Sequence, residues 1–111
     1  MIFNEWLELS SADRESEKAN WHVFEPGYWH ALAHEAASRF AGEFGANKKV
    51  RRICKSLFRS DELIIAVQTD AAPGELLPLP ESYLDFRVMQ FAGKTPEGVL
   101  VDVAPLSRTA V

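Results

Sequence analysis

Two histidines one helical turn apart, His30 and His34, form the first arrangement in this sequence that could do chemistry. In the segment HALAHE both imidazoles could reach one metal ion from a single helix. Two ligands do not complete a site, and a third would have to come from His22 or from a carboxylate elsewhere. The order also differs from the metalloprotease helix, in which a glutamate directly follows the first histidine. We therefore expect a boundary pair of histidines, with no bound metal and no cofactor.

Cys54 is the only cysteine, so it cannot form an internal disulfide. Arg52 and Lys55 would lower the pKa of its thiol if that thiol were exposed. We favour a buried thiol that packs as a small apolar side chain. The sequence also contains no phosphate-binding glycine loop, serine nucleophile elbow or paired-carboxylate signature. These observations lean against an enzyme without excluding one.

Large aromatic side chains gather in the N-terminal half of the chain and could line a ligand pocket. Eight of the twelve aromatic residues precede residue 45. Ligand sites are largely apolar clefts, and a cleft between a helix and a sheet would suit one. A domain of this size also needs aromatic residues for its own core, so core packing is the alternative. The residues that would line the pocket are Trp21, Tyr28, Trp29 and His30.

Six basic residues and no acidic residue occupy positions 48–59, between two acidic segments. Residues 1–47 and 60–111 each hold eight acids and three bases, which gives charges of −5, +6 and −5 along the chain. Nucleic-acid-binding domains usually carry an overall excess of bases, whereas this chain has a net charge of −4. We expect these bases to pair with acids inside the fold or across a symmetric dimer, or to be solvated. This basic band consists of Lys48, Lys49, Arg51, Arg52, Lys55 and Arg59.

The composition is that of one globular domain spanning residues 1–111. With 47% hydrophobic and 25% charged residues the chain has ordinary globular values, so disorder is not the default interpretation. The first residues lack the cationic start of a signal peptide, and no apolar run approaches the roughly 18 residues of a membrane-spanning helix. Together with the lone cysteine, this predicts a reducing, cytoplasmic location without membrane association.

The segment 50–69 decides the fold. Residues 63–67 are apolar on both faces of a strand and rich in β-branched side chains, which is typical of a central strand. Residues 50–58 have apolar side chains at helical spacing, but a helix there would place like charges one turn apart, at a cost of roughly 0.2–0.5 kcal/mol per pair. A strand would instead reach the central strand through the polar loop 59–62 and form a hairpin. We favour the hairpin and keep the helix as the alternative.

Helices are predicted before this segment. The apolar residues of 28–44 form one stripe with the helical period, and Gly45 suits the position after a helix end. The alanines of that stripe would allow a close approach to a sheet. Residues 2–9 predict a short amphipathic helix, and Ser10 can cap a polar helical segment after it.

Two further strands are predicted near the C-terminus. Residues 83–91 alternate between apolar and polar side chains, and residues 99–103 form a final short apolar run. We expect these two strands to pair as a second hairpin. The predicted fold is α+β, with N-terminal helices followed by a three- or four-stranded antiparallel sheet in sequence order and the 28–44 helix packed on one face.

The functional hypothesis that follows is a non-enzymatic interaction module that acts as a homo-oligomer, with a dimer as the first expectation. It rests on the absence of a catalytic signature, the surplus of large aromatic residues and a sheet whose edges need protection. A small-molecule-binding protein with an aromatic pocket between helix and sheet is the alternative. Nucleic-acid binding through the basic band is less favoured, and another protein partner stays open.

Overall fold

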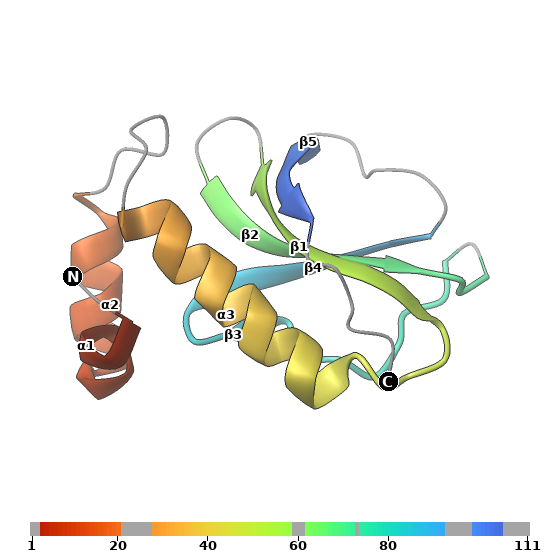
Figure 1. The fold of residues 1–111 in the computed structure, drawn as a ribbon, viewed down its shortest axis with the longest axis horizontal. Coiled ribbons are helices and arrows are strands. Elements are labelled where there is room, and N and C mark those ends of the chain that lie inside the picture. The colour runs from red at the N-terminus through yellow and green to blue at the C-terminus, as the bar shows by residue number, and fades with distance from the viewer. Residues whose placement is uncertain (1–2, 21–27, 59–61, 73, 93–98, 106–111) are drawn as a thin grey trace.

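The computed structural model describes residues 3–20, 28–58, 62–72, 74–92 and 99–105, with Tyr28 and 99–105 described by their backbone alone. The described residues form three helices and five strands, whose arrangement can be followed in Figure 1. The helices are α1 (Phe3–Glu8), α2 (Ser11–Lys18) and α3 (Tyr28–Phe44). The strands are β1 (Val50–Phe58), β2 (Glu62–Thr69), β3 (Ser82–Tyr83), β4 (Phe86–Ala92) and β5 (Val99–Pro105).

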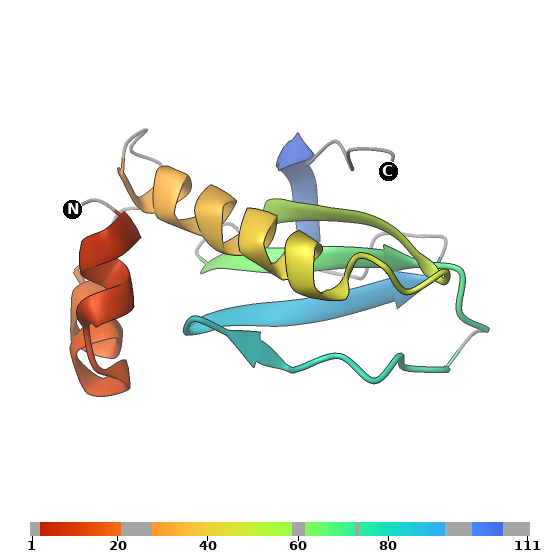
Figure 2. The same cartoon turned by 60° about the horizontal axis from the view of Figure 1, so that its bottom comes forward.

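The α+β class and the packing of the 28–44 helix on the sheet are confirmed. In both views α3 lies across one face of the sheet, while α1 and α2 stand together beyond one end of the strands (Figures 1 and 2). Ser10 caps α2 as predicted, because its hydroxyl accepts a hydrogen bond from the Asp13 amide at 3.2 Å. No side chain of α2 is buried, so this helix covers the molecule from outside.

The sheet is mixed, so the prediction of a purely antiparallel sheet in sequence order is wrong. The strands are arranged β3-β4-β2-β1-β5. β1 pairs antiparallel with β2 and with β5, whereas β2 and β4 are parallel. The expected second hairpin is also wrong, because β5 lies beside β1 at the far side from β4. Parallel neighbours need a connection of a dozen or more residues, and here residues 70–85 supply it, with no helix among those that the structure describes.

The β1–β2 hairpin is confirmed, and the helical spacing of residues 50–58 has another cause. Ile53 faces the helix-side core and Cys54 faces the opposite cluster, and both are buried. Because β1 is an interior strand, apolar residues are needed on both of its faces, and that pattern imitates a helical stripe. The central position of β2 is also confirmed, since residues 63–67 are all buried between β1 and β4.

The predicted strand 83–91 is divided by a tight turn. β3 ends at Tyr83 and β4 begins at Phe86, with Leu84 and Asp85 between them at φ values of 50° and 64°. Two consecutive positive φ values are the pattern of a type I′ hairpin turn, which usually contains asparagine and glycine. Leucine is not typical of such a turn, and apolar and polar side chains alternate across it. The sequence of this segment therefore indicates one continuous strand.

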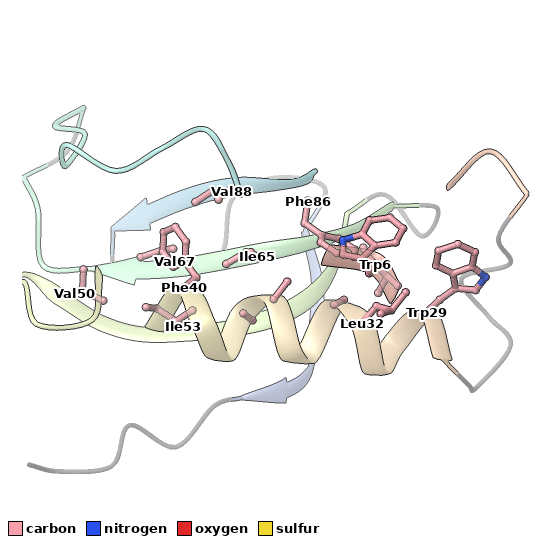
Figure 3. Close-up of a cluster of buried hydrophobic side chains, with 14 of the residues drawn as sticks. Trp6, Trp29, Leu32, Phe40, Val50, Ile53, Ile65, Val67, Phe86 and Val88 are labelled. Carbon is pink, nitrogen blue, oxygen red and sulfur yellow. The ribbon is translucent and has the colours of Figure 1, made fainter. Parts of the chain in front are cut away.

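Helix α3 forms the centre of the main core. Its predicted stripe is buried against β1 and β2, and the alanines let the helix lie close to the sheet (Figure 3). The helix ends at Phe44, where the Gly45 amide donates to the Ala41 carbonyl at 2.9 Å. A Cβ atom at Gly45 would collide with that carbonyl, which explains the glycine. The buried residues of the stripe are Trp29, Leu32, Ala33, Ala36, Ala37 and Phe40.

The outer edge of β4 is covered by the connection from β2. The Gln90 side chain donates to the Leu77 carbonyl at 3.0 Å and accepts from the Leu77 amide at 2.8 Å. The Val88 amide donates to the Glu81 carbonyl at 2.8 Å. The Val88 bond satisfies a backbone group of the β4 edge, and the Gln90 bonds hold the connection beside that edge, which could otherwise pair with another chain.

Candidate functional site

An aromatic cluster joins α1, α3 and β4 where the three elements meet. Trp6 is fully buried, with its ring 6.1 Å from Trp29 in an edge-on arrangement and 5.5 Å from Phe86 (Figure 3). Trp29, predicted as a pocket residue, is only 7% exposed. In the described structure it therefore packs as a core residue. Trp21 lies outside the described residues, as does the side chain of Tyr28.

A set of polar contacts fastens the N-terminal helices to the turn between β3 and β4. Trp6 Nε1 donates to the Leu84 carbonyl at 3.0 Å. Asp85 accepts from the Ser11 hydroxyl at 3.0 Å and forms an ion pair with Arg14 at 3.1 Å. Lys18 Nζ donates to the Asp85 carbonyl at 2.5 Å. Non-glycine residues at positive φ cost free energy, and the turn keeps this conformation because so many contacts fix it.

Lys55 is the most unusual charged residue of the described chain. Although it belongs to the basic band, it lies on the face of β1 that carries Ile53 and Leu57, and its residue is only 8% exposed. Its ammonium donates to the carbonyl of His30 at 3.4 Å. Burial lowers the pKa of Lys55 below its ordinary value of 10.5. The structure thus brings together one residue of the predicted basic band and one of the predicted pocket.

The histidine pair gains no third ligand among the described residues. His30 and His34 are both partly buried on α3. No group of three or more histidine, cysteine, aspartate or glutamate side chains that could hold a metal ion occurs in the described part of the chain. His22 lies outside that part.

The rest of the basic band is largely engaged with acids or neighbours. Lys49 pairs with Glu75 and Arg51 with Asp70, each at 3.1 Å. The hydrogen bond with Lys49 lowers the pKa of the Glu75 carboxyl. Lys48 is exposed, Arg52 lies beside Cys54, and Arg59 is outside the described residues.

These ion pairs lead us to predict no salt-sensitive binding to DNA or RNA. Phosphate binding by the band would make affinity fall with salt, with a log-log slope of about −0.9 per neutralised phosphate. Arg51 already has a carboxylate partner, and Lys55 points into the protein. Fluorescence-anisotropy titrations at low and moderate salt should therefore stay flat. Micromolar binding that is lost both on adding salt and in a variant with Arg51→Glu and Arg52→Glu would contradict this prediction.

The sheet face opposite α3 carries a second apolar cluster. Cys54, Ile64 and Ala66 are buried at its centre. Three partly buried side chains pack around them, namely Phe58, Met89 and Phe91. At this rim the Arg87 guanidinium lies 4.5 Å from the Phe58 ring centroid and 3.2 Å from the Glu62 carboxylate.

The Cys54 thiol has the environment of a structural cysteine. It is buried, and burial raises its pKa despite the opposing effects of Ser56 and Arg52. Its sulfur lies 3.6 Å from the Ser56 hydroxyl oxygen. Its burial confirms the predicted packing position, and a thiol with a raised pKa is a poor nucleophile at neutral pH.

No family model, curated protein or solved structure matches this chain. Within the described ranges no helix combines the length and the apolar character needed to cross a membrane. A functional proposal must therefore rest on the geometry of the described residues.

Two features of the described structure were not predicted from the sequence. The Asp85 contacts join positions more than 60 residues apart, and the contact between Lys55 and the His30 carbonyl joins β1 to α3. The signal that could have marked Lys55 is the strand alternation, which places it on the same face of β1 as Ile53 and Leu57. The cluster around Ile64 could be expected from the apolar residues on both faces of β2. The side chains at its rim depend on the parallel pairing of β4 with β2.

Proposed function

We propose that this protein is a non-enzymatic interaction module that self-associates through the sheet face opposite α3. The observation that carries the proposal is the apolar rim of Phe58, Met89 and Phe91, whose side chains are only partly buried. α3 covers the other face, so it does not shield this rim. Aromatic residues, methionine and arginine are enriched at protein interfaces.

The charges at this rim suit a second copy of the same chain. Arg87 and Glu62 keep 45% and 39% of their side-chain surface exposed although they pair with each other. A two-fold interface brings the same patch of both subunits together, so a patch with both signs of charge can be self-complementary. Arg87 of each copy would then lie near Glu62 of the other. Solvent-exposed pairs contribute little to stability, so exchanging them between copies costs little.

Self-association is expected to be concentration-dependent and sensitive to the rim. Sedimentation-velocity ultracentrifugation over a range of concentrations should show a dimer, and Phe91→Glu should shift the population to monomer because two acids would be buried per interface. Leu76→Glu is the matched control, since Leu76 is 74% exposed on the connection from β2. A strict monomer at high concentration would refute self-association. If only Leu76→Glu abolished the dimer, the interface would lie near Leu76 and not at the rim.

A second candidate function is small-molecule binding between α3 and the sheet. Lys55 favours it, because this largely buried residue donates to the neutral His30 carbonyl and forms no ion pair with a carboxylate of the described residues. The reducing, cytoplasmic location stays a prediction under either function.

A further inference from the structure

Helix α2 docks on the rest of the protein without contributing a buried side chain. Its sequence, SADRESEK, contains a single apolar residue, Ala12, and that residue is exposed. Most helices in proteins are stabilised by packing an apolar face, and an isolated helix of this length is marginal in water. Polar contacts must therefore hold α2 in place and keep it helical.

Three side chains on one face of α2 converge on Asp85. Ser11, Arg14 and Lys18 stand at positions i, i+3 and i+7, which lie on one side of a helix. The Ser11 hydroxyl and the Arg14 guanidinium reach the Asp85 carboxylate, and the Lys18 ammonium donates to the carbonyl of the same residue. Arg14 also donates to two backbone carbonyls in the last turn of α1, at 2.9 and 3.1 Å. One residue of the β3–β4 turn thus receives three side chains of α2.

The turn that receives α2 has an unfavourable backbone conformation. Leu84 and Asp85 have φ values of 50° and 64°, a region that costs free energy for leucine in particular. β3 contains only two residues, so its pairing with β4 contributes little to fixing the turn. Contacts from the N-terminal helices supply the rest. Undocking of α2 and relaxation of the turn therefore favour each other.

Helix α3 and the central strands are held by contacts of another kind. The buried stripe of α3 packs on β1 and β2 in the main apolar core, and no residue of α2 belongs to that core. Segments with few buried apolar contacts open at a lower free energy than a packed core does. The two parts of the molecule thus differ in what they lose when α2 leaves.

We propose that α2 is a latch that opens separately from the core. In the open form α2 is undocked and unfolded and the β3–β4 turn is relaxed, while α3, β1 and β2 stay folded. α1 remains anchored by Trp6, which is fully buried. Opening exposes the Asp85 carboxylate and the polar face of α2, and so switches the surface at this end of the sheet between two forms. The rim of Phe58, Met89 and Phe91 takes no part, so this inference does not depend on self-association.

Native-state hydrogen exchange of the full-length protein, measured amide by amide with NMR at rising urea below the unfolding transition, tests the separate opening. We expect an opening constant for α2 at least about a hundredfold larger than that for α3. The α2 constant should depend little on urea, because its opening exposes little surface, whereas the α3 constant should rise steeply. If both helices show the same opening constant and the same urea dependence, they unfold together and the proposal is wrong.

A variant of the docking residue distinguishes opening of the latch from fraying of the helix ends, which would not respond to Asp85. Asp85→Ala should raise the opening constant of α2 at least about tenfold, because three side chains lose their acceptor or its conformation. Asp70→Ala is the matched control, since it removes an exposed carboxylate that pairs with Arg51, and it should change that constant by less than about twofold. Equal effects of the two variants would overturn the proposal.

A second variant tests the coupling from the side of the helix. Ser16→Pro breaks α2 at an exposed position, and Ser16→Ala is its matched control. The proline variant should shift the amide resonances of Leu84 and Asp85 and leave those of α3 and β2 in place. Unchanged resonances of the turn would mean that α2 and the turn are not coupled, and loss of the α3 resonances would mean that the core needs α2. Either result would contradict the separate latch.

Discussion

Replacing Trp6 with alanine is expected to remove about 3–5 kcal/mol from the free energy of unfolding, because it empties a fully buried position. The indole contacts both Trp29 and Phe86, so α1 would lose its ring contacts with α3 and β4. Its ring nitrogen also donates to the Leu84 carbonyl, which would be left without that donor. A loss of this size is a large part of the 5–15 kcal/mol by which domains are usually stable.

Urea denaturation followed by circular dichroism measures this loss without relying on tryptophan emission. Trp6→Phe separates the two contributions, since it keeps a ring and removes the N–H, and it should cost about 1–3 kcal/mol. Leu76→Ala, at a position that is 74% exposed, should change stability by no more than about 0.5 kcal/mol. If Trp6→Ala cost no more than Leu76→Ala, the N-terminal helices would not be packed as described.

Local patterns in the sequence predicted most elements of this fold correctly. The stripe of α3 and the two-sided apolar run of β2 each reflect what a single element must bury, so they can be recognised without knowing its neighbours. The hairpin of β1 and β2 was inferred against the spacing of residues 50–58, by weighing like charges one turn apart. That argument succeeded because electrostatic repulsion along a helix is also a local property.

The arrangement of the strands depends on distant contacts and could not be predicted in this way. Parallel neighbours are usually connected through a helix, and residues 70–85 show no helical pattern, yet they bring β4 alongside β2 in parallel. One contribution to this arrangement comes from the Gln90 side chain, which forms hydrogen bonds with the Leu77 backbone 13 residues earlier. Nothing in the local pattern around Gln90 marks it for that role.

The candidate sites were predicted only in part for the same reason. Trp29 lies on the buried stripe of α3 as predicted, but the sequence did not connect His30 with Lys55. That connection requires β1 to be a strand and to direct Lys55 towards α3, which is a consequence of register. The strained turn at Leu84 could not be predicted from local sequence either, because leucine at positive φ is stabilised by residues of α1 and α2 far away in the sequence.

Asp85→Ala is the second substitution for which we expect a large effect, about 2–4 kcal/mol of lost stability. It removes the carboxylate that pairs with Arg14, where the two side chains are only 18% and 13% exposed, and that accepts from Ser11. Arg14 would keep its bonds to the Trp6 and Leu7 carbonyls but lose its counter-charge. Alanine also tolerates the left-handed backbone at φ 64° less well than aspartate does.

Two further substitutions separate these causes in the same denaturation experiment. Asp85→Asn keeps a side chain that tolerates the left-handed conformation and can accept from Ser11, so it should lose only the charge, about 1–2 kcal/mol. Asp70→Ala breaks the Arg51 pair, in which the side chains are 51% and 60% exposed, and should cost at most about 1 kcal/mol. Equal effects of Asp85→Ala and Asp70→Ala would mean that the contacts at the β3–β4 turn do not hold α1 and α2 in place. The expected order is instead Asp85→Ala, then Asp85→Asn, then Asp70→Ala, because burial of the ion pair and the backbone conformation of the turn both increase the loss.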